Sequence, residues 1–295
     1  MSNKDQELSE KPVLWIHGIG YLPQNLLSLT VGGIVRAKLP KFIAKPVNKL
    51  FVKAFGINMT EAEKPLAEYR TIEDVFTRRL SPGARKVGQG LVSPADGRLV
   101  KSEAVQAGRG VQAKGRTYSL SDLVFGKTQP VPEDFKPGWF VTVYLAPHNY
   151  HRVHTPSAAT VKALRYIPGK LWPVNDAAVK TVPSLFCTNE RLVFDLVLPG
   201  GGKIWAVMVG ALNVGRMESP ILPNFVSNSA GRQFSELGVQ ETALEHCLSA
   251  GDELGTFMLG STVVLVLDQE ATKIFNPIAL TESRDVRMGQ SLSRS

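Results

Sequence analysis

A short run near the C-terminus constrains the fold of this chain most strongly: residues 263–267 read Val-Val-Leu-Val-Leu. Such a dense, mostly β-branched run is typical of a strand buried in a core. Gly260, Ser261 and Thr262 come directly before it, so the serine stands on a rigid support. Glycine has no Cβ, which leaves its carbonyl open to close approach, and Ser261 is therefore placed to attack its own backbone. A Gly-Ser pair before a strand is also ordinary turn sequence, and taken alone it favours that simpler interpretation.

Alternating apolar residues predict most of the other strands, from residue 90 onward. They predict strands at 140–145 and 159–167, and a hairpin whose strands, 191–198 and 203–209, flank a Pro-Gly-Gly-Gly turn. Asp96 and Gly97 predict a tight turn between two strands around residues 92–98. The sequence therefore predicts an α+β fold, with a β-rich body of mainly antiparallel strands at 86–295 and a helical region at 1–85.

The composition indicates a folded, basic protein. The 295 residues are 43% hydrophobic, enough for one large domain with an ample core. The two cysteines have no metal-type spacing, which favours a reduced compartment. The formal net charge of +8 suggests an anionic partner, either a nucleic acid or an acidic membrane surface. The first residues lack the pattern of a secretory signal, and no apolar run reaches about 18 residues, so we expect no membrane span.

The basic charge gathers in the N-terminal region. Residues 11–60 contain no acidic residue and seven basic ones: Lys11, Arg36, Lys38, Lys41, Lys45, Lys49 and Lys53. Helices are predicted at 23–37 and 41–55, and in the second helix lysines recur every fourth residue beside an apolar face that includes Phe42, Leu50, Phe51 and Phe55. Such a helix can lie in a membrane interface, its apolar face among acyl chains. A helix that packs on its own domain and turns its lysines to water has the same pattern, and the sequence does not choose between the two.

Two Thr-x-x-acid sequences, beginning at Thr60 and Thr71, have the form of capping boxes. A capping box predicts that a helix begins there, because its two side chains bind backbone N–H groups that the first turn leaves free. From Thr71 the predicted helix continues to Leu80 and stops at Ser81-Pro82-Gly83.

Three polar features accompany the strands of the β-rich body: Asp96 in its turn, the pair His151 and His154, and Ser261. A serine nucleophile needs a base, and an imidazole base needs a carboxylate to fix its tautomer. Each feature also has a simpler explanation, since Asp before Gly is usually turn chemistry and a loop histidine is usually hydrogen-bonded. His148 joins the other two histidines within seven residues, but no nearby Cys, Asp or Glu completes a first shell, so a metal site is not favoured.

Longer motifs around these residues resemble those of bacterial phosphatidylserine decarboxylases. The motifs are Val-Ser-Pro-Ala-Asp-Gly at 92–97, Tyr-His-Arg-Val-His at 150–154 and Leu-Gly-Ser-Thr at 259–262. Supporting stretches lie in the same order at 67–71, 112–120, 166–169 and 189–191. The resemblance covers about residues 50–290, whereas the first 50 residues match only in character.

The resemblance implies a chain that cuts itself between Gly260 and Ser261. Ser261 Oγ would attack the Gly260 carbonyl to give an ester, and elimination followed by hydrolysis would leave a pyruvoyl group on residue 261. The products are a large fragment, 1–260, and a small one, 261–295. By the same resemblance His154 is the base, Asp96 its orienting partner, and His151 serves in decarboxylation. The pyruvoyl ketone would form a Schiff base with the amine of phosphatidylserine and accept the electrons released with CO2, which gives phosphatidylethanolamine.

Such a substrate stays in a bilayer, so we expect a peripheral protein on the cytoplasmic side of the cell membrane, held to an anionic surface by residues 11–60. Homodimerisation is an expectation that rests on the resemblance alone. Two other functions fit parts of the sequence. One is a serine hydrolase with an intact Asp96, His154 and Ser261, although Ser261 lies outside a Gly-x-Ser-x-Gly elbow. The other is a non-catalytic basic module, for which a membrane suits the charge better than nucleic acid because few stacking aromatics accompany it.

Overall fold

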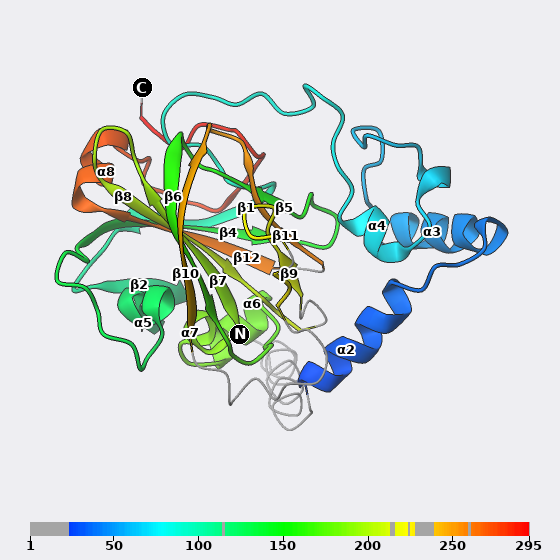
Figure 1. Cartoon of the computed structure of the whole chain (residues 1–295), viewed down its shortest axis with the longest axis horizontal. Coiled ribbons are helices and arrows are strands. Elements are labelled where there is room, and N and C mark those ends of the chain that lie inside the picture. The colour runs from blue at the N-terminus through cyan, green and yellow to red at the C-terminus, as the bar shows by residue number, and fades with distance from the viewer. Residues whose placement is uncertain are drawn as a thin grey trace, which may run out of the picture.

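A computed structural model describes residues 24–113, 116–212, 216–223, 225–227, 239–258 and 261–294 of the chain. The basic residue Lys11 and the predicted cleavage partner Gly260 lie outside the described residues. The helices are α2 (Gln24–Val35), α3 (Lys41–Phe55), η1 (Leu66–Glu68), α4 (Ile72–Phe76), α5 (Leu120–Phe125), α6 (Asp176–Thr181), α7 (Leu185–Thr188) and α8 (Gln269–Phe275). Figure 1 shows α2, α3 and α4 gathered on one side of a body made mostly of strands.

The body is built on an eight-stranded sheet in the order β10-β6-β7-β8-β12-β4-β1-β13, in which all neighbours are antiparallel. Its strands are β1 (Gly97–Ala104), β4 (Pro137–Leu145), β6 (Ala159–Ile167), β7 (Arg191–Val197), β8 (Lys203–Val209), β10 (Gln240–Leu248), β12 (Ser261–Asp268) and β13 (Arg284–Val286). A second sheet joins β5 (Arg152–His154), β11 (Glu253–Phe257) and β9 (Met217–Glu218), and β2 (Arg109–Ala113) pairs with β3 (Arg116–Ser119). The predicted α+β fold with mainly antiparallel strands is confirmed.

β12 lies inside the large sheet, between β8 and β4. Its residues from Ser261 to Leu267 are all buried, which is the outcome that the apolar run predicts. The helix α8 packs against β4, β8 and β12, and α5 contacts β3, β8 and α7 (Figure 1). One large hydrophobic cluster holds these elements together, so the site at the start of β12 rests on the rigid centre of the molecule.

Two local predictions before β1 are wrong. No helix begins at Thr60, whose hydroxyl donates to the Asn58 side chain, while Ala62 forms a bridge with Leu80. The helix that begins at Thr71 ends at Phe76 rather than reaching Leu80, because the chain must turn back for that bridge. The capping box at Thr71 itself is confirmed, with both of its side chain–backbone hydrogen bonds present.

Gly97 serves a different purpose from the one predicted. Residues 92–98 do not join two strands, since among them only Gly97 and Arg98 belong to a strand, at the start of β1. The glycine is needed because β4 approaches it so closely that the Tyr144 carbonyl would collide with a Cβ at this position. A close approach of two strands, and not a tight turn, therefore fixes the backbone directly after Asp96.

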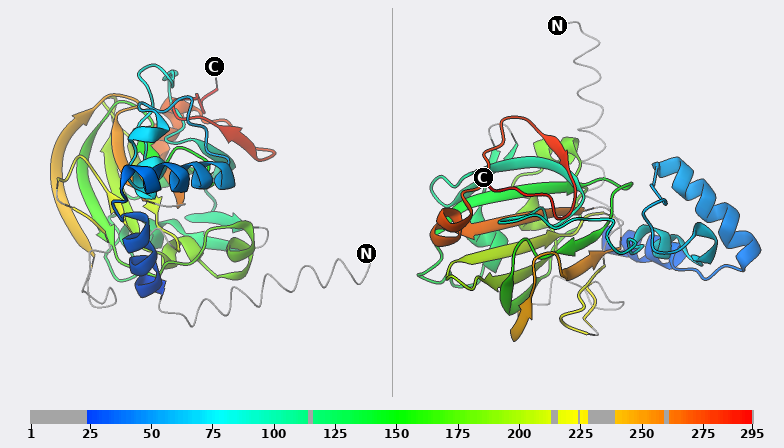
Figure 2. Two further views of the ribbon diagram at one scale, coloured as in Figure 1. Left: turned by 90° about the vertical axis from the view of Figure 1, so that its right-hand side faces the viewer. Right: turned by 90° about the horizontal axis from the view of Figure 1, so that it is seen from above.

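The helix α3 contacts the rest of the protein along one side. Ala44 and Asn48 are buried, the Asn48 side chain donates to the Tyr69 carbonyl at 2.9 Å, and Phe51 is partly buried. Other large apolar side chains face outward, with Phe42 79% and Leu50 69% exposed. Figure 2 shows α3 standing away from the sheet. Within the described part of the chain, no helix is long and apolar enough to cross a membrane.

Candidate active site

Ser261 is the first residue of β12 and lies opposite Leu145, the last residue of β4. It is fully buried, and its Oγ has no hydrogen-bond partner among the described residues. Leaving a buried hydroxyl without a partner costs about 1–3 kcal/mol, so such a group calls for a functional explanation. The structure thus keeps an unbonded hydroxyl at the point where the apolar run begins.

His151 is tied to the strand end beside Ser261. Its Nε2 donates to the carbonyl of Ala146, which directly follows Leu145, at 3.1 Å. Because a carbonyl only accepts, Nδ1 carries the lone pair, and Nδ1 has no partner in the described part of the chain. The ring stacks on Phe76 of α4 with centroids 3.9 Å apart. Burial lowers the pKa of His151 to about 3, so the ring is neutral at neutral pH.

His154, in β5, has both ring nitrogens engaged. Nδ1 donates to the Gly251 carbonyl at 2.7 Å, so Nε2 is the unprotonated nitrogen and accepts from the Tyr150 hydroxyl at 3.0 Å. Burial lowers the pKa of His154, while burial raises the pKa of Tyr150 and keeps its hydroxyl protonated. His154 therefore has the tautomer that a general base requires, and a phenol caps the basic nitrogen.

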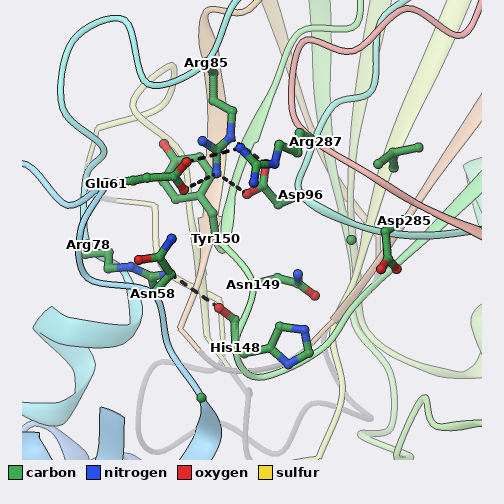
Figure 3. Close-up of a pocket in the computed structure, with 13 residues that line it drawn as sticks. Asn58, Glu61, Arg78, Arg85, Asp96, His148, Asn149, Tyr150, Asp285 and Arg287 are labelled. Atoms are coloured by element: carbon green, nitrogen blue, oxygen red, sulfur yellow. Dashed lines mark hydrogen bonds and ion pairs between the residues drawn. The ribbon is translucent and has the colours of Figure 1, made fainter. Parts of the chain in front are cut away.

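Asp96 is held by partners other than His154. The Arg85 guanidinium donates to both of its carboxylate oxygens (Figure 3). The backbone N–H of Met288 donates to Oδ1 at 2.8 Å. Arg85 also pairs with Glu61 at 3.0 Å, and these two carboxylates raise the pKa of the guanidinium. No hydrogen bond joins Asp96 to His154 in the described structure, although the His154 N–H donates to the Pro94 carbonyl at 2.8 Å. The role of Asp96 as an orienting partner stays a prediction.

Comparison with known proteins decides which family this arrangement represents. A family model described as phosphatidylserine decarboxylase matches residues 72–294. The chain is 37% identical over 276 residues to the phosphatidylserine decarboxylase proenzyme of Myxococcus xanthus, covering 92% of this chain and 94% of the relative. It is 38% identical over 280 residues to the proenzyme of that name from Halorhodospira halophila, covering 92% and 91%. The chain belongs to the phosphatidylserine decarboxylase family.

Membership of the phosphatidylserine decarboxylase family draws attention to a cavity of about 280 Å³ beside Asp96. Three arginines line it: Arg78, Arg85 and Arg287 (Figure 3). Arg85 and Arg287 pair with Glu61, whereas Arg78 is 4% exposed, donates only to backbone carbonyls and leaves its Nε unbonded among the described residues. A buried guanidinium that lacks a carboxylate partner favours the binding of an anionic group in this cavity.

The sequence analysis did not predict several residues that contact the candidate catalytic groups. Arg85 follows an ordinary Ser-Pro-Gly turn, and nothing in its spacing connects it with Asp96. Phe76 was expected as an apolar residue of a helix, not as the partner of an imidazole ring. Tyr150 lies inside a motif that carries the resemblance, and this was the one available signal for its contact with His154. Their roles arise from contacts that only the fold creates.

Proposed function

We propose that this chain is a proenzyme that cuts itself before Ser261, and that the product decarboxylates phosphatidylserine to phosphatidylethanolamine and CO2. The observation that carries the proposal is the buried Ser261 Oγ at the start of a rigid central strand, which has no hydrogen-bond partner among the described residues. A hydroxyl with no competing hydrogen bond is free to attack a neighbouring carbonyl. The relatives' names as phosphatidylserine decarboxylase proenzymes support both halves of the proposal.

In the first reaction the proposed base is His154. Its Nδ1–H is fixed by the Gly251 carbonyl, so the lone pair on Nε2 is available once the Tyr150 hydroxyl turns away. The negative charge of Asp96 favours the protonated ring that forms when the serine proton is taken. Arg85 and the Met288 N–H in turn hold the Asp96 carboxylate in place.

The surroundings of residue 261 fit a covalent pyruvoyl group. Such a group supplies a ketone that condenses with an amine and accepts the electrons released with CO2. β12 is buried between β8 and β4, which keeps water from the reacting atoms. His151 is neutral at neutral pH and presents an unbonded Nδ1 lone pair, so it suits the handling of a proton during decarboxylation.

The first test is a denaturing gel with mass spectrometry of the purified chain. The wild-type protein should give fragments 1–260 and 261–295, with a blocked N-terminus on the smaller. Ser261→Ala and His154→Ala should each remain one chain, and Asp96→Asn should cut at least about 10²-fold more slowly because the imidazolium loses a stabilising charge. An uncut wild-type chain with a reactive serine would instead indicate a serine hydrolase.

We propose further that the protein acts as a peripheral protein on the cytoplasmic side of the membrane. The exposed Phe42 and Leu50 on α3 support this location, as do the exposed lysines of the same helix. Exposed apolar side chains can insert among acyl chains, and the lysines can bind anionic headgroups.

A further inference from the structure

A buried carboxyl lies near Ser261 that the proposed reactions do not use. Glu190, directly before β7, is 1% exposed. Its two carboxyl oxygens accept hydrogen bonds from the Tyr166 hydroxyl at 3.1 Å and from the Ser227 hydroxyl at 3.2 Å. The burial of a carboxyl is expensive, and most buried carboxylates have a cationic partner.

The sheet register places Glu190 level with Ser261. Val209, at the end of β8, is opposite Thr262 of β12 on one side and opposite Arg191 of β7 on the other. One step further, Gly210 comes level with Ser261 and Glu190, and its N–H donates to the Glu190 carbonyl at 2.9 Å. Two strand spacings therefore separate Glu190 from Ser261, roughly 10 Å between backbones. Residues that are opposite each other in a sheet share a face, so this register puts both side chains on the same face.

The residue between them has no side chain, and the Glu190 carboxyl fills its place. A Cβ on Gly210 would lie 2.9 Å from Glu190 Cγ and 3.2 Å from Oε1. The Glu190 side chain therefore extends across Gly210, in the direction of the strand that begins with Ser261. The backbones of Glu190 and Ser261 are about 10 Å apart, and the Glu190 side chain spans part of that distance. Its carboxyl is thus within reach of a small group bound at residue 261.

This carboxyl differs from Asp96 because no cation from the described part of the chain neutralises it. No basic side chain of the described residues forms an ion pair with Glu190, whereas Asp96 is paired with Arg85. Burial raises the pKa of Glu190 to about 7, so the carboxyl can gain or lose a proton near neutral pH.

We infer that Glu190 binds the ammonium group of the substrate and carries one of its protons while the amine condenses with the ketone at residue 261. This inference rests on the proposed function. The ammonium nitrogen brings three protons. Glu190 takes one and so frees the nitrogen lone pair for attack on the ketone carbon, whose oxygen receives a second proton. Glu190 then returns the first proton to that oxygen, which departs as water, and the third proton stays on nitrogen, so charge and atoms balance.

The test compares two amines that differ in charge. Wild-type protein and Glu190→Gln are treated with a short-chain phosphatidylethanolamine and cyanoborohydride, and separately with hydroxylamine, and the mass of fragment 261–295 is followed. The lipid amine arrives as an ammonium ion and needs Glu190, whereas hydroxylamine is uncharged at neutral pH. Glu190→Gln should cut itself normally and react with hydroxylamine like wild type, while its labelling by the lipid amine slows at least about tenfold.

Two further variants sharpen the result. Gly210→Ala keeps the carboxyl but pushes it from its place, and should show the same selective loss. Asp195→Asn removes another carboxyl whose pKa burial raises, in the strand β7 that follows Glu190, but paired with Arg165, and should label like wild type with both reagents. Normal lipid-amine labelling of Glu190→Gln or of Gly210→Ala overturns the inference. Failure of hydroxylamine to label the wild-type protein would overturn the proposed function instead.

Discussion

His151 shows how burial changes the chemistry of a single residue. Desolvation lowers its pKa to about 3, and the nearby positive charge of Arg78 acts in the same direction. In the unfolded chain the same imidazole titrates near pH 6.5. Between these two pH values the unfolded chain binds one more proton than the folded chain at this position, so acid favours unfolding.

The free energy of unfolding should therefore fall as the pH drops below about 6.5, with a contribution from His151 of up to about 1.4 kcal/mol per pH unit, and should not depend on this group above pH 7. His151→Gln removes the titrating ring and should flatten that part of the curve. Urea unfolding at pH 5 and pH 7 measures this change in the free energy of unfolding. The proteins with and without His151→Gln both carry Ser261→Ala, so that each is uncut. Parallel curves for the two proteins would contradict a neutral, buried His151.

At the residue scale the sequence predicted the residues whose type already indicates chemistry. Asp96, His151, His154 and Ser261 could be selected because activated-serine chemistry needs carboxylate, imidazole and hydroxyl groups, and because these residues stand in the motifs that resemble the family. Glu190 and Arg85 could not, because glutamates and arginines are common on any surface. What sets these two apart is burial and a partner many residues away, neither of which leaves a local pattern.

At the element scale, a local sequence motif predicted a helix correctly only where tertiary contacts allowed the backbone to be helical. The capping boxes at Thr60 and Thr71 look alike in sequence, yet only the second begins a helix. The difference is tertiary, because the bridge between Ala62 and Leu80 draws the first segment into an extended path. The strands of the body were predicted well, since their burial imposes the alternation that sequence reading detects.

This contrast gives a matched pair of variants. Thr71→Ala should lower the free energy of unfolding by about 1 kcal/mol, because α4 loses the side chain that accepts from the Asp74 N–H. Thr60→Ala should change it by less than about 0.5 kcal/mol, since its hydroxyl meets only the exposed Asn58 side chain. Urea unfolding of both variants in the uncut Ser261→Ala chain compares them. Equal losses would contradict the difference between the two segments.

At the scale of the whole molecule, α3 is set apart from the catalytic body. Ile57, Tyr69 and Val75 form a small cluster of their own, against which Phe51 and Val52 of α3 pack. The sequence left two interpretations of this helix open, since self-packing and membrane binding require the same pattern. The helix packs on its own domain through Phe51 and Val52, and the exposed Phe42 and Leu50 are the side chains that the proposed membrane contact would use.

Charge reversal on this helix tests where the protein acts. Lys41, Lys45, Lys49 and Lys53 are all exposed and have no ion pair among the described residues. Each basic residue near an anionic surface contributes about 1 kcal/mol, and salt screens that attraction. Replacing all four with Glu should release the protein from anionic vesicles in a flotation assay and depress turnover of vesicle-borne phosphatidylserine. Turnover of a soluble short-chain substrate should persist, because His151, His154 and Ser261 lie in the body.

The matched control changes the same amount of charge elsewhere. Lys101, Lys127, Lys136 and Lys180 lie on the body, also without an ion pair among the described residues, so their replacement with Glu lowers the net charge equally. If α3 is the docking element, this control should keep most of its vesicle binding, since long-range charge falls off within about 8 Å at physiological salt. The apolar side chains add a salt-independent part, so Phe42→Ser with Leu50→Ser should weaken binding at high salt as well. Unchanged binding of both α3 variants would mean that another surface meets the membrane.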